Sequence, residues 1–157
     1  MSVFAAKACL FALPLLLLSS GCDAGYSYRP DGWSISNGGH EWTKVDDGVS
    51  FLTWGIGGLV GSEDIIPEFE IRNATTTPVI VESAVLLARG KIYDAQLPGK
   101  GELQWRTVLP GEVKRITLYW HLEEVALKSM GEKPEIDLRV RRGVKLDTMK
   151  IKFSRVD

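Results

Sequence analysis

Apolar and polar residues alternate with a period of two along most of the chain after residue 48. Gly, Pro and Asp interrupt this alternation at intervals of roughly 8 to 12 residues, which is typical of short antiparallel strands joined by turns. The strands predicted in this way are 49–54, 68–72, 79–88, 92–93, 103–109, 113–122, 136–141 and 149–153. The pattern therefore predicts an all-β protein.

The sequence predicts the burial or the connection of some of these segments in more detail. Residues 79–88 are almost continuously apolar, so we expect a central strand covered on both faces. Trp105 and Trp120 fall on inward positions of their strands and are assigned to the core. Residues 123–130 change to helical spacing and end at Gly131, which indicates one short helix in a connection. The last two strands form a hairpin around Gly143.

Many short strands with one helical turn predict an antiparallel two-sheet sandwich. The turn at Pro110 and Gly111 leads into an alternating strand with an aromatic-rich end, and this resembles immunoglobulin-like and fibronectin-III-like bacterial envelope domains. The resemblance implies an immunoglobulin-like arrangement. The two cysteines, Cys9 and Cys22, both precede the strands, so no disulfide or thiolate metal site is expected in the folded part.

The first 22 residues differ from the rest of the chain. An apolar run over 8–18 follows Lys7 and is shorter than the roughly 20 residues that a membrane-spanning helix requires. Small residues at 19–21 then precede Cys22, and the segment resembles a bacterial lipoprotein signal, although Ser19 occupies the position that usually holds Leu. This resemblance implies cleavage before Cys22, a lipid on Cys22 with two or three acyl chains, and attachment to a membrane facing the periplasm.

Ordinary secretory cleavage near Ala24 is the alternative. Asp23 resembles the signal that keeps enterobacterial lipoproteins on the inner membrane, but this rule depends on lineage, so both the inner and the outer membrane remain open. The predicted division of the chain is a signal peptide over 1–21, a lipidated tether over 22–32 and a β-sandwich domain over 33–157.

No motif in the sequence identifies a chemical reaction. The glycines at 55–61 miss the dinucleotide fingerprint and are interpreted as a mobile hairpin or bulged strand. His40 and His121 each lack a partner at catalytic spacing, and the acidic residues at 46–47 and 63–70 lack the spacing of a calcium loop. The prediction is therefore a non-enzymatic protein with no catalytic residue, metal site or cofactor, and with no nucleic-acid partner.

Two surfaces could contact a ligand. Trp33 and Trp42 lie in the irregular N-terminal third of the chain. If their indoles are exposed, they would stack on sugar rings or rest at a membrane interface; if they are buried, they would belong to the core. The chain is acidic over 23–138 and basic over 139–157. If the last two strands pair, Arg139, Arg141, Lys150 and Lys152 share a face that either contacts anionic headgroups or protects a sheet edge from aggregation.

These observations favour a lipid-anchored cell-envelope lipoprotein that presents loops or a sheet edge to an envelope protein partner. The alternative is a protein that binds or processes glycans or cell-wall material through Trp33, Trp42 and nearby carboxylates.

Overall fold

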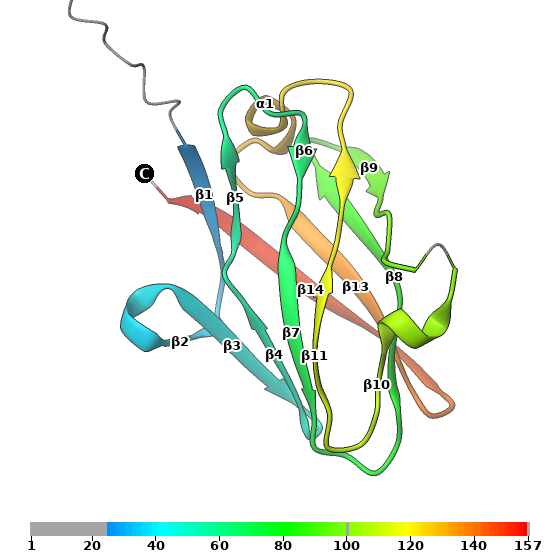
Figure 1. Cartoon of the computed structure of the whole chain (residues 1–157). Coiled ribbons are helices and arrows are strands. Elements are labelled where there is room, and N and C mark those ends of the chain that lie inside the picture. The colour runs from blue at the N-terminus through cyan, green and yellow to red at the C-terminus, as the bar shows by residue number, and fades with distance from the viewer. Residues whose placement is uncertain (1–24, 100, 157) are drawn as a thin grey trace, which may run out of the picture.

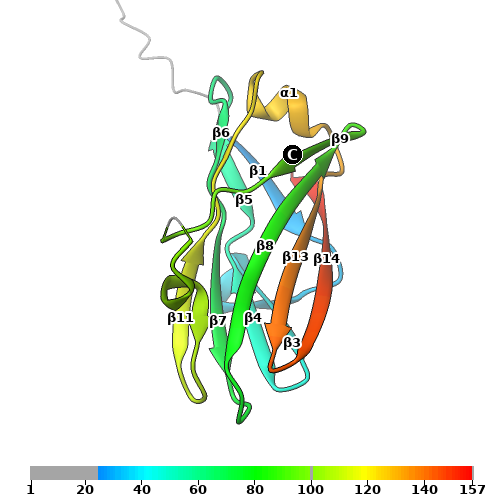
Figure 2. The same cartoon turned by 90° about the vertical axis from the view of Figure 1, so that its right-hand side faces the viewer.

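Two antiparallel sheets pack face to face in the computed structural model, which describes residues 25–99 and 101–156 (Figures 1 and 2). The predicted signal peptide and Cys22 lie outside the described residues. The predicted class, an all-β antiparallel sandwich with one short connecting helix, is confirmed. Among the described residues, no helix is both long and apolar enough to cross a membrane.

The larger sheet has the strand order β10-β8-β13-β14-β1-β5, with β9 added beside β8. Its strands are β1 (Gly25–Pro30), β5 (Ile56–Leu59), β8 (Val79–Ala88), β9 (Lys91–Asp94), β10 (Thr107–Val108), β13 (Glu135–Arg142) and β14 (Lys145–Val156). The longest strands, β8, β13 and β14, lie side by side in its centre, and β13 and β14 form the hairpin predicted around Gly143.

The smaller sheet has the order β11-β7-β4-β3-β2. Its strands are β2 (Ser34–Ser36), β3 (Glu41–Asp46), β4 (Val49–Thr53), β7 (Glu68–Asn73) and β11 (Val113–Thr117). A two-stranded ribbon and three short helical segments complete the fold: β6 (Asp64–Ile65), β12 (Trp120–His121), η1 (Asn37–Gly39), η2 (Leu103–Arg106) and α1 (Ala126–Met130).

Alternation places one apolar face of each sheet in the core. Phe51 and Phe69 of the smaller sheet and Leu138, Ile151 and Phe153 of the larger one are at most 1% exposed. The helix closes one end of the sandwich with Ala126 and Met130 buried, and Gly131 ends it with φ 66°. Non-polar burial between the sheets is the main source of stability in such a fold, because each buried side chain of this size contributes about 1.5–3 kcal/mol.

The domain begins earlier than predicted. Residues assigned to the tether form β1, which pairs with β14 on one side and β5 on the other. Tyr26 and Tyr28 are buried, and the Tyr28 hydroxyl donates a hydrogen bond to the Gly131 carbonyl at 2.6 Å. The assignment of residues 25–32 to a tether is therefore wrong, because their aromatic side chains complete the core.

Three strand predictions also need correction. Residues 103–109 form η2 and the short β10, and Trp105 is 57% exposed, so it is not a core residue. The strand predicted over 113–122 is divided into β11 and β12, although Trp120 is buried as expected. β8 is central in its sheet but alternates buried with partly exposed residues, because no element of the described chain covers its outer face.

Candidate functional site

One half of β14 has a neighbouring strand on one side only. β13 pairs with β14 over 145–152, whereas β1 pairs only with 153–156. The Asp31 amide donates to the Lys152 carbonyl at 2.8 Å, and the chain then crosses to the smaller sheet as β2. Within the described residues, no strand covers the rest of β14 on that side, and we call its residues 145–151 the open edge.

The direction of the backbone groups on the open edge follows from the neighbouring hydrogen bonds. In an antiparallel strand the N–H and C=O of one residue point to the same side, and this side alternates along the chain. The Lys152 carbonyl points toward β1, whereas the Phe153 amide points the other way, to Pro134. The backbone groups of Leu146, Thr148 and Lys150 therefore face outward from the open edge.

A polar cleft of about 320 Å³ lies between the open edge and β3. Lys44 pairs with Phe51 and Asp46 pairs with Val49, and both of these apolar partners are buried. Because paired residues share a face of the sheet, Lys44 and Asp46 occupy inner positions that would otherwise be core. The residues lining the cleft are Lys44, Asp46, Val140, Arg142, Asp147, Thr148, Met149 and Lys150.

Arg142 is the most deeply placed charge in the cleft, with only 10% of its side chain exposed. Its Nη2 donates to Asp46 Oδ2, and its Nη1 lies 3.6 Å from Asp47 Oδ2. The hydrogen bond from Arg142 lowers the pKa of the Asp46 carboxyl. Arg142 Nε and Nη1 and Asp147 Oδ2 are buried and make no hydrogen bond with the described residues. Such unsatisfied groups are costly and point to a further polar partner.

An apolar groove of about 590 Å³ lies at the end of the sandwich where β1 begins, next to α1 and the C-terminal end of β14 (Figure 1). Val60, Val125 and Leu127 supply apolar side chains to it, while Arg89 and Arg155 supply positive charge. Leu59, which pairs with Gly25, and Val60 are 55% and 38% exposed. We call this end the anchor end, because the lipid anchor predicted at Cys22 would precede it in the chain. It differs in chemistry from the polar cleft, which lies beside the opposite half of β14.

The structure does not bring Trp33 and Trp42 together as exposed indoles. Trp33 is only 8% exposed and packs edge-on against Phe69, with ring centroids 6.5 Å apart. Trp42 is partly buried against the core. Of the two alternatives for Trp33, the structure therefore supports the core residue: the side chain belongs to the hydrophobic core next to the point where the chain crosses between the sheets.

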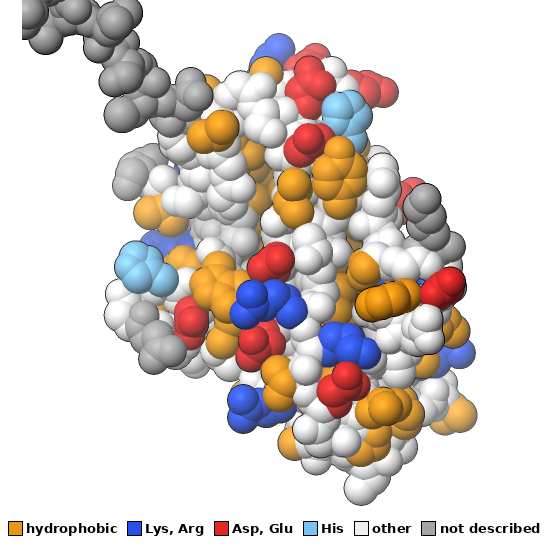
Figure 3. Space-filling model, in the orientation of Figure 1, with side chains coloured by type: hydrophobic (Ala, Val, Ile, Leu, Met, Phe, Trp, Pro, Cys, Tyr) orange, Lys and Arg blue, Asp and Glu red, His pale blue; other side chains and the backbone are white. Residues whose placement is uncertain are grey.

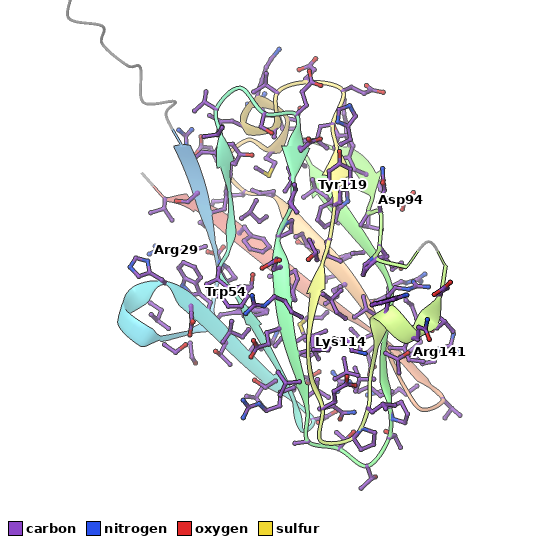
Figure 4. All side chains as sticks on the ribbon, in the orientation of Figure 1. Arg29, Trp54, Asp94, Lys114, Tyr119 and Arg141 are labelled. Carbon is purple, nitrogen blue, oxygen red and sulfur yellow. The ribbon has the colours of Figure 1, made fainter. Side chains whose placement is uncertain are left out.

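The four basic residues singled out from the sequence lie on β13 and β14, but two of them are paired with carboxylates. Arg141 Nε lies 2.6 Å from Glu82 Oε1, and Lys150 Nζ lies 3.4 Å from Glu135 Oε1. Arg141 and the cleft residue Lys150 therefore contribute less free charge than the sequence indicated, whereas Arg139 and Lys152 have no ion pair within the described residues. Figure 4 shows Arg141 on the right of the view, below η2, and Trp54 on the left.

His121, Asp64 and Tyr119 form a polar cluster near the anchor end. His121 Nδ1 and the Tyr119 hydroxyl each lie 2.8 Å from Asp64 Oδ1. The hydrogen bond with Asp64 raises the pKa of His121, and the same bond lowers the pKa of Asp64. The His121 side chain is 58% exposed, so the cluster sits on the surface. His40 is exposed and far from it in the sequence, and no group of three potential metal ligands occurs in the described part of the chain.

The glycine stretch has a structural role in the closed part of the larger sheet. A Cβ atom on Gly55, which has φ 81°, would lie 2.3 Å from the Tyr28 carbonyl oxygen. A Cβ atom on Gly58 would lie 2.7 Å from the Tyr26 hydroxyl. These glycines let β5 approach β1 closely, which explains their presence without a phosphate-binding function.

Two exposed tryptophans were not identified as surface features from the sequence. Trp105 donates from Nε1 to Glu102 Oε2 at 3.0 Å, so the indole is held in place although it is exposed. Trp54 stacks under the Arg115 guanidinium, 4.6 Å from the ring centroid. Figure 3 shows the face of the smaller sheet with acidic and basic side chains interspersed and apolar residues in separate spots. This face therefore offers no large apolar patch.

Comparisons with known proteins bear on the fold alone. No family model matches the chain, and no curated protein matches it. The structure is similar to that of a functionally unknown protein from Listeria monocytogenes EGD-e, with a TM-score of 0.52 and 11% sequence identity over 81% of this chain and 87% of that chain. A protein from Archaeoglobus fulgidus aligns with a TM-score of 0.37 and 15% identity, over 85% and 96% of the two chains.

Proposed function

We propose that the protein is a lipid-anchored cell-envelope lipoprotein that acts as a non-enzymatic protein-interaction module. The observation that carries the interaction role is the open edge of β14 beside a cleft with unsatisfied buried polar groups. An exposed strand edge is a template for pairing with another chain, and natural sheets usually cover or shorten such edges. The signal-like segment that ends at Cys22 supports the lipid anchor.

The short distance between Cys22 and the first strand supports a defined orientation at the membrane. Cys22 precedes Gly25 by three residues, and an extended chain spans only about 3.3–3.6 Å per residue. The anchor end would therefore lie against the headgroups, where its apolar groove and its Arg89 and Arg155 side chains suit an anionic interface. The cleft, beside the opposite half of β14, would face away from the bilayer.

The immunoglobulin-like arrangement is part of this proposal. It is supported at the level of architecture by two antiparallel sheets of short strands that enclose one core. Fold likeness of this kind carries no function by itself, so the proposed role depends on the edge and the cleft.

The anchor and the partner can be tested together in a bacterial host. The full chain should sediment with membranes and require detergent for release, whereas Cys22→Ser should not be acylated, because the thioether to the lipid cannot form. Chemical crosslinking in the solubilised envelope should then give one protein partner in constant ratio to the wild-type chain. A wild-type chain that is soluble without detergent, or that crosslinks to no protein, would contradict the proposal.

A second candidate is binding to glycans or cell-wall material, and the observation that favours it is the fixed, exposed Trp105. Aromatic rings held rigid by a polar neighbour such as Glu102 can stack on the apolar face of a sugar. Binding of soluble glycan fragments should then change tryptophan fluorescence in the wild type but not in Trp105→Ala, with Trp54→Ala as the matched control. Retention on cell-wall material without a protein partner would favour this candidate over the first.

A further inference from the structure

We propose that the open edge of β14 accepts an added strand from an extended acidic peptide segment of a partner protein, whose carboxylate enters the polar cleft. This inference rests on the proposed interaction role and specifies its site and the chemistry of its ligand. The added strand would continue the line of β1 along β14, beyond the point where β1 leaves the sheet at Asp31.

The backbone supplies the first requirement for strand addition. Leu146, Thr148 and Lys150 direct their N–H and C=O groups outward, and no described strand pairs with them on that side. Five residues from 146 to 150 extend about 17 Å, which is the length of an ordinary strand. In this recognition mode the main chain gives affinity, and the alternate side chains of the added strand give specificity.

Side-chain direction determines what the added strand must carry. Residues that lie opposite Asp147 and Met149 would point to the inner face of the sheet, because paired residues share a face. Asp147 and Met149 both line the cleft, as does the buried Arg142. A ligand side chain opposite Met149 would be apolar, whereas one nearer the sheet end would reach Nε and Nη1 of Arg142, which have no hydrogen bond with the described residues.

The charge of the cleft selects a carboxylate. Its lining contains three cations, Lys44, Arg142 and Lys150, and two carboxylates, and Arg142 and Lys150 already have carboxylate partners. Lys44 has no ion pair within the described residues, and Arg142 has two nitrogen atoms without a hydrogen bond. A planar carboxylate matches the fork of an arginine and forms charge-assisted hydrogen bonds. The preferred ligand therefore has Asp or Glu separated by one residue from an apolar side chain.

Two variants of one residue separate edge pairing from side-chain effects. Thr148→Pro removes an outward N–H and blocks an added strand, yet it removes no hydrogen bond to β13, so the sheet is preserved. Thr148→Val keeps the N–H and is the matched control. Lys44→Met keeps most of the side-chain volume and removes one cleft cation.

The probe is a library of random decapeptides on phage, selected on the full chain in detergent micelles. Selected peptides should carry Asp or Glu two positions from an apolar residue, and a synthetic copy should shift the backbone amide NMR signals of Leu146, Thr148 and Lys150. Thr148→Pro should weaken its binding by about tenfold or more, and Lys44→Met by about fivefold, while Thr148→Val changes little. A copy N-methylated at the pairing residues should lose binding to the wild type, which makes the test independent of how well Thr148→Pro folds.

Several results would overturn the inference. They are a library that yields no specific peptide, peptides that lack a carboxylate, and binding that is equal in Thr148→Pro and the wild type. Self-association that Thr148→Pro abolishes would identify a second copy of the chain as the occupant instead. Acylation of Cys22 does not affect these measurements, so failure here leaves the anchor to be judged by membrane fractionation.

Discussion

The two halves of β14 differ in both neighbours and chemistry. From Phe153 to Val156 the strand pairs with β1 on one side, and on the other side its Phe153 and Arg155 amides donate to the Pro134 and Glu132 carbonyls. Phe153 is fully buried. From Lys145 to Ile151 it lies beside β13 alone, and the inner position Asp147 is a partly exposed carboxylate. One strand is thus bonded on both sides in one half and on one side only in the other.

This difference shows what limits the core. Lys44 and Asp46 of β3 are the cross-strand partners of buried residues of β4, so they lie on the inner face of the smaller sheet. Because these two side chains are not apolar, they leave a polar cleft between the sheets instead of a packed core. Arg142 and Asp46 then pair across the gap. A partly exposed ion pair adds little net stability compared with apolar packing, and this supports the recognition role proposed for the gap.

The largest expected contrast is between core truncations in the two halves. Phe153→Ala should lower the free energy of unfolding by about 3–5 kcal/mol, because it leaves a cavity in a closed part of the core. Met149→Ala, at the margin of the cleft, should cost only about 1–2 kcal/mol, since solvent can enter the space. Chemical denaturation measures both. Equal losses would mean that the two halves are equally well packed.

A second contrast tests whether β1 belongs to the core. Tyr28→Phe should cost about 1–3 kcal/mol, because it leaves the Gly131 carbonyl without its hydrogen bond. Tyr26→Phe removes a buried hydroxyl that has no partner in the described structure, so its stability should be unchanged or slightly higher. If neither variant changes the denaturation midpoint, residues 25–30 behave as the tether that was first predicted.

The Asp46 carboxylate should make the cleft sensitive to acid. Its pKa is lowered in the folded state, chiefly by the hydrogen bond from Arg142, so its contribution is present at neutral pH and is lost as the pH falls through the folded pKa. Asp46→Asn should cost about 1 kcal/mol at neutral pH, because the carboxylate is nearly half exposed and screened. Asp47→Asn is the control and should have almost no effect. An acid dependence that is identical in Asp46→Asn and the wild type would exclude this pairing.

The smallest effect is expected at the exposed cluster near the anchor end. The hydrogen bond between the two side chains raises the pKa of His121 and lowers the pKa of Asp64. His121 is therefore protonated while Asp64 is ionised only between these two pKa values. An NMR titration should show a lower His121 pKa in Asp64→Asn than in the wild type. Added salt should reduce this difference, because the pair is in solvent. A His121 pKa that does not respond to Asp64→Asn would show that the two groups do not interact in solution.

Alternation was sufficient to predict several of the strands that contribute one apolar face to the core. β4, β7 and the β13–β14 hairpin appear where Phe51, Phe69 and Leu138 alternate with polar residues. β1 was missed because Pro30 and Gly32 resemble loop punctuation, although Tyr26 and Tyr28 already alternate with Ser27 and Arg29.

Contacts that the alternation pattern does not record account for the other differences. Residues 103–109 alternate like a strand, but Trp105 bonds to Glu102, and the Lys114 ammonium donates to the Gln104 carbonyl at 3.1 Å, which favours a helical turn. The open edge could not be predicted, because it exists only where β1 leaves β14. The cleft likewise depends on the separation of β3 from β13, which no local pattern records.

The most direct test of a lipid-anchored module is the intact mass of the full chain after extraction from membranes. We predict a mature protein that starts at Cys22 and carries two or three fatty acyl chains, with the folded domain beginning three residues later. A chain that starts near Gly25, or that retains an unmodified thiol on Cys22, would contradict the anchor.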